Sequence, residues 1–220
     1  MRYTGIPESL TPRPLATAVS RAWRQSAFAI LLLASCCGAP QPYINLWYDP
    51  VAHVRGTPGR KVVVVKFADT RQQADMTTVG EFRNQYGAKV GELHVSRDED
   101  VGAWLANAIT KELTRAGYYV ERYRDAAPPD ADIIVTGTVP EVFAYTRATG
   151  GLRAVVVCNV AVTRAGGVVL LNRPYMGVAT SGRGGCFTTR METLSSFYGG
   201  ALQQLMRRMA PEVIAAVEGR

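Results

Sequence analysis

The sequence is poor in the residue types from which catalytic and metal sites are most often built. It has only two histidines, His53 and His94, among 220 residues, and they form no His-Glu-x-x-His motif. Its four cysteines include no pair at the spacing of zinc ligands. Zinc sites need several histidine or cysteine ligands at suitable spacing, and a Ser-His-Asp triad needs a histidine as its general base. We therefore expect no catalytic site, no metal site and no cofactor.

The positive charge is not gathered into a basic block. The formal net charge is +7, but four arginines (2, 13, 21 and 24) and one acid, Glu8, lie before residue 36. Taking away these four positive charges and one negative charge leaves +4 for the remainder. Proteins that bind nucleic acids concentrate basic and aromatic side chains on one surface. We expect no nucleic-acid partner.

The apolar run near the start is too short to cross a bilayer. It extends over eight residues, Ala27 to Ala34, whereas a spanning helix needs about twenty. Arg21 and Arg24 precede it, and small residues follow it. A basic region, a short apolar core and a small-residue exit are typical of a secretory signal. We predict a signal peptide over residues 1–35.

The end of this run, Leu33-Ala34-Ser35-Cys36, resembles a bacterial lipobox. The resemblance implies cleavage before Cys36, attachment of diacylglycerol to its thiol and acylation of the new amino terminus. Several acyl chains hold a protein firmly on a membrane. Cys37 stands where an aspartate would resemble an inner-membrane retention signal, so we expect an outer-membrane anchor with the chain facing the periplasm. The alternative is a buried helix with two incidental cysteines, but glycine and proline follow at once.

The mature chain divides into a tether and one domain. Residues 36–60 are rich in proline and glycine and predict a lipidated tether, in which the aromatic segment 43–48 is expected to lie against the domain. Residues 61–220 are predicted to form one domain. Its periodicities predict, in order, a strand at 61–67, a hairpin at 79–95, a helix at 98–116, strands at 118–123 and 132–146, a hairpin from 153 to about 180, and a helix at 193–217.

Two prolines interrupt these predicted elements. Pro140 lies inside the long strand and predicts a bulge, a kink or an exposed edge, because proline donates no hydrogen bond to a ladder. Pro211 is expected to kink or split the last helix. Neighbouring strands with two helices indicate an α+β fold, a mixed and mostly antiparallel sheet with both helices packed on one face.

Several short motifs of the domain resemble those of YajG-type bacterial lipoproteins. They are "VVVVKFADTR", then "VGEF", and "AGYYV" at the end of the first helix. "ADIIVTGTV" resembles a signature of a wider group of envelope lipoproteins with a TolB-amino-terminal-like α/β domain. The resemblance implies a cell-envelope lipoprotein without established catalytic residues. Cys158, Cys186 and the glycine-rich segment before the last helix depart from it.

Cys158 and Cys186 are candidates for a structural disulfide. Cys158 shares one strand face with Ala154, Val156, Val160 and Val162, so this apolar face should meet the helices. Export to an oxidising compartment favours a bridge. The closed loop of 28 residues would stabilise the fold by roughly 3 kcal/mol. Two buried free thiols are the alternative.

Two further segments carry weaker signals. Gly182, Arg183, Gly184 and Gly185 precede the last helix and form a candidate anion-binding loop, although they lack the lysine and Ser/Thr of a phosphate loop. A plain flexible connection is the alternative. Asp69 with Arg71, after the first strand, indicates either a functional edge or a local salt bridge.

These observations predict a lipid-anchored envelope lipoprotein that acts without catalysis, as an accessory or assembly protein, through contacts with an envelope protein. The alternative is a periplasmic binding module for a small lipid or glycan ligand held between sheet and helices.

Overall fold

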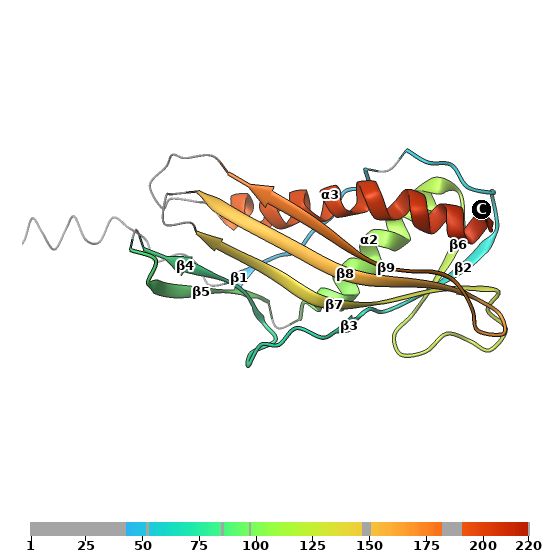
Figure 1. Ribbon diagram of the computed structural model, residues 1–220, viewed down its shortest axis with the longest axis horizontal. Coiled ribbons are helices and arrows are strands. Elements are labelled where there is room, and N and C mark those ends of the chain that lie inside the picture. The colour runs from blue at the N-terminus through green and yellow to red at the C-terminus, as the bar shows by residue number, and fades with distance from the viewer. Residues whose placement is uncertain are drawn as a thin grey trace, which may run out of the picture. The chain divides into compact units, whose positions relative to one another are not determined.

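The three longest strands are neighbours in the sheet: β7 (Ile133–Thr146), β8 (Leu152–Arg164) and β9 (Val168–Thr180). They pair in antiparallel fashion along almost their whole lengths (Figure 1). The computed structural model describes residues 43–51, 53–84, 86–96, 98–146, 151–181 and 191–219. These residues form two helices and one mixed sheet of nine strands, which confirms the predicted α+β fold.

Short strands line the other side of β7. β2 (Lys61–Val65) and β3 (Ala68–Asp69) pair with its first part, and β4 (Thr78–Arg83) pairs with its end. All three run parallel to β7. β6 (Tyr119–Tyr123) extends the sheet beyond β2, while β5 (Lys89–Val95) and β1 (Tyr43–Ile44) extend it beyond β4. The strand β7 therefore changes its parallel neighbour along its length.

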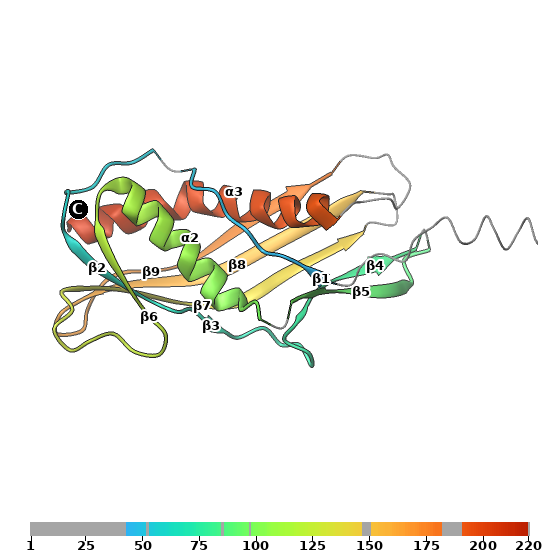
Figure 2. The same ribbon diagram turned by 180° about the vertical axis from the view of Figure 1, so that it is seen from behind.

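Both helices cover one face of this sheet (Figure 2). The helix α2 (Val101–Ala116) packs on β2 and β7, and α3 (Met191–Glu218) packs on β8 and β9. As predicted, Ala154, Val156, Cys158, Val160 and Val162 of β8 face the helices, and each is fully buried. Because Val155 and Val157 alternate with them, these two side chains lie on the sheet face opposite the helices.

The helix α2 begins and ends with residues suited to these positions. The carboxylate of Asp100 accepts a hydrogen bond from the amide of Ala103 at 3.0 Å, so Asp100 is the N-cap and the helix begins at Val101, slightly later than predicted. Gly117 ends the helix at φ +106°, a conformation that favours glycine. The helix α3 runs unbroken through Pro211, so it is not split there. No helix among the described residues is both long and apolar enough to cross a membrane.

The strand β2 is covered on both faces. Val62 and Val64 belong to the main core beneath the helices, whereas Val63 and Val65 pack with Ala131 on the other face. A strand buried on both faces needs apolar side chains at every position. This explains the continuous run of four valines in the sequence.

The segment 43–51, which we call the strap, packs on the helices. Ile44 and Tyr48 are almost fully buried. The indole of Trp104 in α2 donates a hydrogen bond to the carbonyl oxygen of Trp47 at 3.2 Å, and the ammonium of Lys111 donates to the carbonyl of Tyr48 at 2.8 Å. Most of the segment predicted as a tether therefore lies on the domain.

The free edge of β9 offers few hydrogen-bond donors. The amide of Ser181 donates to the carbonyl of Leu152 in β8 at 2.9 Å, whereas the amide of Val178 donates to the side chain of Gln204 in α3 at 2.5 Å. Along β9 the amide N–H groups therefore point alternately toward β8 and away from it, and those of even-numbered residues point away. Pro174 belongs to this set and has no N–H, so positions 174 and 178 of this edge offer no donor to a neighbouring strand.

Candidate functional site

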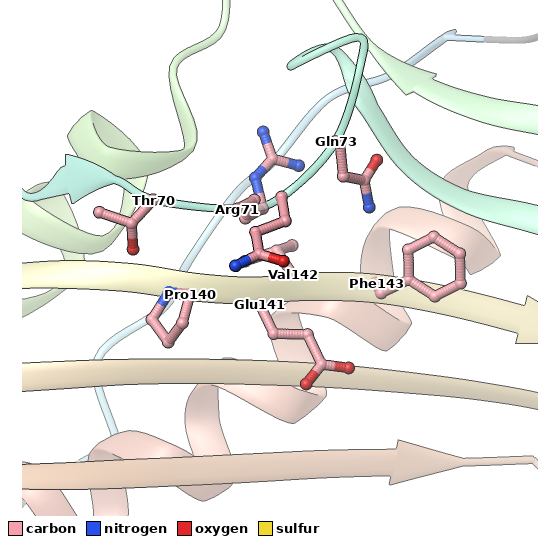
Figure 3. A pocket seen from close by; sticks show the side chains of 8 residues that line it. Thr70, Arg71, Gln73, Pro140, Glu141, Val142 and Phe143 are labelled. Atoms are coloured by element: carbon pink, nitrogen blue, oxygen red, sulfur yellow. The ribbon is translucent and has the colours of Figure 1, made fainter.

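A hollow opens beside β7 where this strand changes its parallel neighbour (Figure 3). The amide of Thr70 still donates to the carbonyl of Val139 at 3.1 Å, and the next parallel pair joins Gly80 to Ala144. Between them lies Pro140, where the register with β8 shifts and forms the predicted bulge. The hollow has a volume of about 330 Å³ and is lined by Thr70, Arg71, Gln72, Gln73, Pro140, Glu141, Val142 and Phe143.

Arg71 holds the loop that forms one wall of this hollow. Its guanidinium pairs with both carboxylate oxygens of Asp69, and the distance from Nη2 to Oδ2 is 2.8 Å. The same group donates to the carbonyl oxygens of Thr78, at 2.8 Å, and of Met76. Arg71 is almost fully buried. The predicted pair of Asp69 and Arg71 is therefore a local salt bridge, and its arginine fixes the loop instead of binding a ligand.

A second hollow adjoins the first. It has a volume of about 440 Å³ and shares Gln72, Gln73 and Phe143 with its neighbour. Further polar residues of the loop and of β4 and β5 complete its lining: Asp75, Thr78, Glu81, Lys89 and Glu92. With Glu141, this double hollow has four acids and one lysine besides the paired Arg71. A partner that presents basic or amide groups would match this lining.

An apolar patch continues from Phe143 across the sheet. Phe143 of β7 is paired with Val155 of β8, which is paired with Val178 of β9. In the same way Glu141 is paired with Val157, which is paired with Met176. We call the patch Phe143, Val155, Val157, Met176 and Val178 the open face, because it lies opposite the helices. The side chain of Met176 is 52% exposed.

One buried donor on this side of the sheet lacks a partner. Arg153 shares its strand face with Val155 and Val157, and its Nε atom is buried without a hydrogen-bond partner among the described residues. Folded proteins rarely leave a buried donor without an acceptor.

The arrangement suits binding better than chemistry. The hollows are shallow depressions on a sheet, and their lining combines amides, carboxylates and one aromatic ring. His94 lies at the base of the β4–β5 hairpin, near Asp75, Glu92 and the ring of Tyr43. Among the described residues no cluster of histidine, cysteine, aspartate and glutamate forms that could hold a metal ion.

Most of the site residues predicted from the sequence fall outside the described residues. These are the lipidation site Cys36, the proposed bridge partner Cys186, and the candidate anion loop of Gly182, Arg183, Gly184 and Gly185. The described Cys158 is a buried thiol whose Sγ lies 3.7 Å from the sulfur of Met209. Burial raises its pKa to about 12. The Cys158–Cys186 bridge stays a prediction.

Sequence reasoning missed Gln72, Gln73 and Phe143, which line both hollows. Pro140 was the available signal, since a proline inside a strand marks the place where pairing is interrupted. The polar stretch after Asp69 lies opposite it only because β3 and β4 pair with the same strand.

Comparisons with known proteins support the fold. No protein-family model and no curated protein matches the sequence. The solved structure of protein XCC0632 from Xanthomonas campestris, of family DUF330, is similar with a TM-score of 0.56 at 10% identity, over 80% of this chain and 95% of that one. An uncharacterized protein is similar with a TM-score of 0.50 at 13% identity, over 80% and 99% of the two chains.

A structure described as a lipoprotein from Caulobacter crescentus is more distantly similar. Its TM-score is 0.39 at 13% identity, over 57% of this chain and 89% of that one. At these identities the likeness concerns the fold alone, and the third similarity is too weak to support an argument. The resemblance to YajG-type proteins stays a prediction.

Proposed function

We propose that this chain is a lipid-anchored protein of the bacterial envelope that binds an envelope protein through its open face, as a non-catalytic accessory or assembly component. The observation that carries the proposal is the apolar patch across β7, β8 and β9 opposite the helices, in which Met176 is 52% exposed, Phe143, Val157 and Val178 are half-buried, and Val155 is buried. Exposed apolar groups gathered on one surface are typical of sites that a protein partner covers.

The packing beneath the helices argues against the alternative of a lipid or glycan held between sheet and helices. Tyr198, Leu205 and Met206 of α3 are fully buried against the sheet, as is Cys158 of β8. A ligand in this layer would have to displace close-packed side chains. A surface contact on the open face displaces only water.

The anchor is tested by a Cys36→Ser substitution in the full-length chain, expressed in a Gram-negative host. We expect the unchanged chain to be recovered with the outer membrane, and the variant to lose this association because serine has no thiol to be acylated. Membrane flotation and intact mass measure both properties. A Cys37→Ser variant is the matched control and should remain on the membrane. An unchanged chain that retains residues 1–35 and has no acyl group would contradict the anchor.

The contact surface is tested by placing a photocrosslinking amino acid at Met176 of the lipidated chain. The control position is Val168 on the same strand, which is 55% exposed but lies away from the open face patch. In irradiated cells, we expect position 176 to give a crosslinked product of one defined mass that contains an envelope protein. Position 168 should give no such product. Lipid or glycan adducts alone would support the carrier alternative, and adducts of equal yield at both positions would contradict a specific surface.

A further inference from the structure

The point at which the chain enters the domain is fixed. Tyr43 pairs with His94 and Ile44 pairs with Val95, so β1 runs parallel to β5. Ile44 is 1% exposed, and the amide of Leu46 donates to the carboxylate of Glu99 at 2.8 Å. The strap therefore attaches the start of the domain to β5 and α2.

Little chain separates this point from the predicted anchor. Seven residue steps lead from Cys36 to Tyr43, and an extended chain spans at most about 3.6 Å per residue, so they reach about 25 Å at most. This step rests on the proposed lipid anchor. A tether this short limits the orientations that the domain can adopt relative to the bilayer.

The direction of β1 indicates which end this is. The strand β5 begins at the turn of the β4–β5 hairpin, residues 84–88, and ends at Val95. Because β1 is parallel to β5, Tyr43 is the residue of β1 that lies nearer to this turn. The hairpin pairs with the last residues of β7, whereas β2 and β6 lie at the first residues of β7 (Figure 2). The hairpin turn and β6 therefore mark opposite ends of the domain.

The surface of the hairpin suits a lipid interface. Tyr86 in the turn is 84% exposed, and Val90 in β5 is 62% exposed. The charged neighbours pair with one another, Arg83 with Glu81 and Lys89 with Glu92. Tyrosine is enriched at the headgroup level of membranes, where its ring is apolar and its hydroxyl is hydrated.

We propose that the turn of the β4–β5 hairpin contacts the phospholipid interface with Tyr86 and Val90. The long strands β7, β8 and β9 then lead away from the bilayer, and the open face is turned sideways, toward proteins anchored in the same membrane. Because the hairpin charges are paired, this contact depends on apolar and aromatic groups and needs no anionic lipid.

The test uses the lipidated full-length chain in phosphatidylcholine vesicles, with bromine on the lipid acyl chains as a quencher of tryptophan fluorescence. The variants are Tyr86→Trp and, as matched control, Tyr119→Trp, since Tyr119 is 59% exposed on β6 at the other end. We expect the emission added by the tryptophan at position 86 to be lost in brominated vesicles. The emission added at position 119 should stay unchanged, at low and high salt alike.

Vesicle flotation and intact mass, measured on the same samples, separate the two proposals. A chain that carries acyl groups and floats, but shows no quenching at position 86 or equal quenching at both positions, overturns the orientation and leaves the anchor intact. A chain without acyl groups that does not float overturns the anchor, and the orientation with it. Quenching at position 86 only with anionic vesicles contradicts the apolar character of the contact.

Discussion

A Gly177→Ala substitution is expected to destabilise the protein by about 3 kcal/mol, because α3 lies directly on the backbone of β9. A Cβ atom at position 177 would lie 1.9 Å from the carbonyl oxygen of Ala201 and 2.8 Å from the amide nitrogen of Leu205. Both atoms belong to a helix backbone, which cannot rotate out of the way as a side chain can. The helix must shift and open the core around Leu205. Urea unfolding followed by circular dichroism measures the loss.

The matched control is Gly200→Ala in α3. A Cβ atom there would meet the Cβ atom of Ala179 at 3.6 Å, which is an ordinary contact. Alanine also has a higher helix propensity than glycine, so this variant should be more stable by up to about 1 kcal/mol. Equal unfolding midpoints for the two variants would show that α3 does not approach β9 this closely.

A Glu112→Ala substitution is expected to release the strap and to lower the free energy of unfolding by about 3 kcal/mol. Glu112 is 1% exposed, and its carboxylate accepts hydrogen bonds from the hydroxyl of Tyr48 and, at 2.7 Å, from the amide of Val51. Truncation leaves these donors without their acceptor in a buried place. Burial and the neighbouring carboxylate raise the pKa of Tyr48 well above its usual range, so its hydroxyl stays protonated and donates.

The amide of Val51 provides a direct readout of this release. Hydrogen exchange at this amide should accelerate strongly in Glu112→Ala, along with the rest of the strap. Glu99→Ala is the control, because Glu99 also accepts a strap amide but is half-buried, and it should cost only about 1 kcal/mol. Continued protection of the Val51 amide in Glu112→Ala would refute the role of this carboxylate.

The sequence predicted those parts of the fold that depend on local patterns. The alternating face of β8 around Cys158 and the apolar stripe of α2 each follow from one stretch of residues. The turns of the hairpins likewise follow from short stretches of sequence. Gly166 and Gly167 adopt φ values of +81° and +80°, which favour glycine and mark the turn between β8 and β9.

The candidate site could not be predicted in the same way, because it depends on contacts between distant segments. The hollow exists because β3 and β4 both pair with β7 and leave a gap at Pro140. The strap depends on the contact of Glu112 with Tyr48, 64 residues away along the chain. Neither the parallel register nor this pairing produces a periodic signal in the residues involved.

The proline on the outer edge of β9 has a consequence for a chain held on a membrane. If the proposed anchor holds the chain on a membrane, its copies diffuse in two dimensions and meet far more often than molecules in free solution. Strand edges with unpaired N–H and C=O groups would allow neighbouring copies to pair edge to edge into a continuous β-sheet. With Pro174 and the amide of Val178 both withdrawn from pairing, this edge is a poorer template for a neighbouring strand, which favours association through side-chain surfaces that can discriminate between partners.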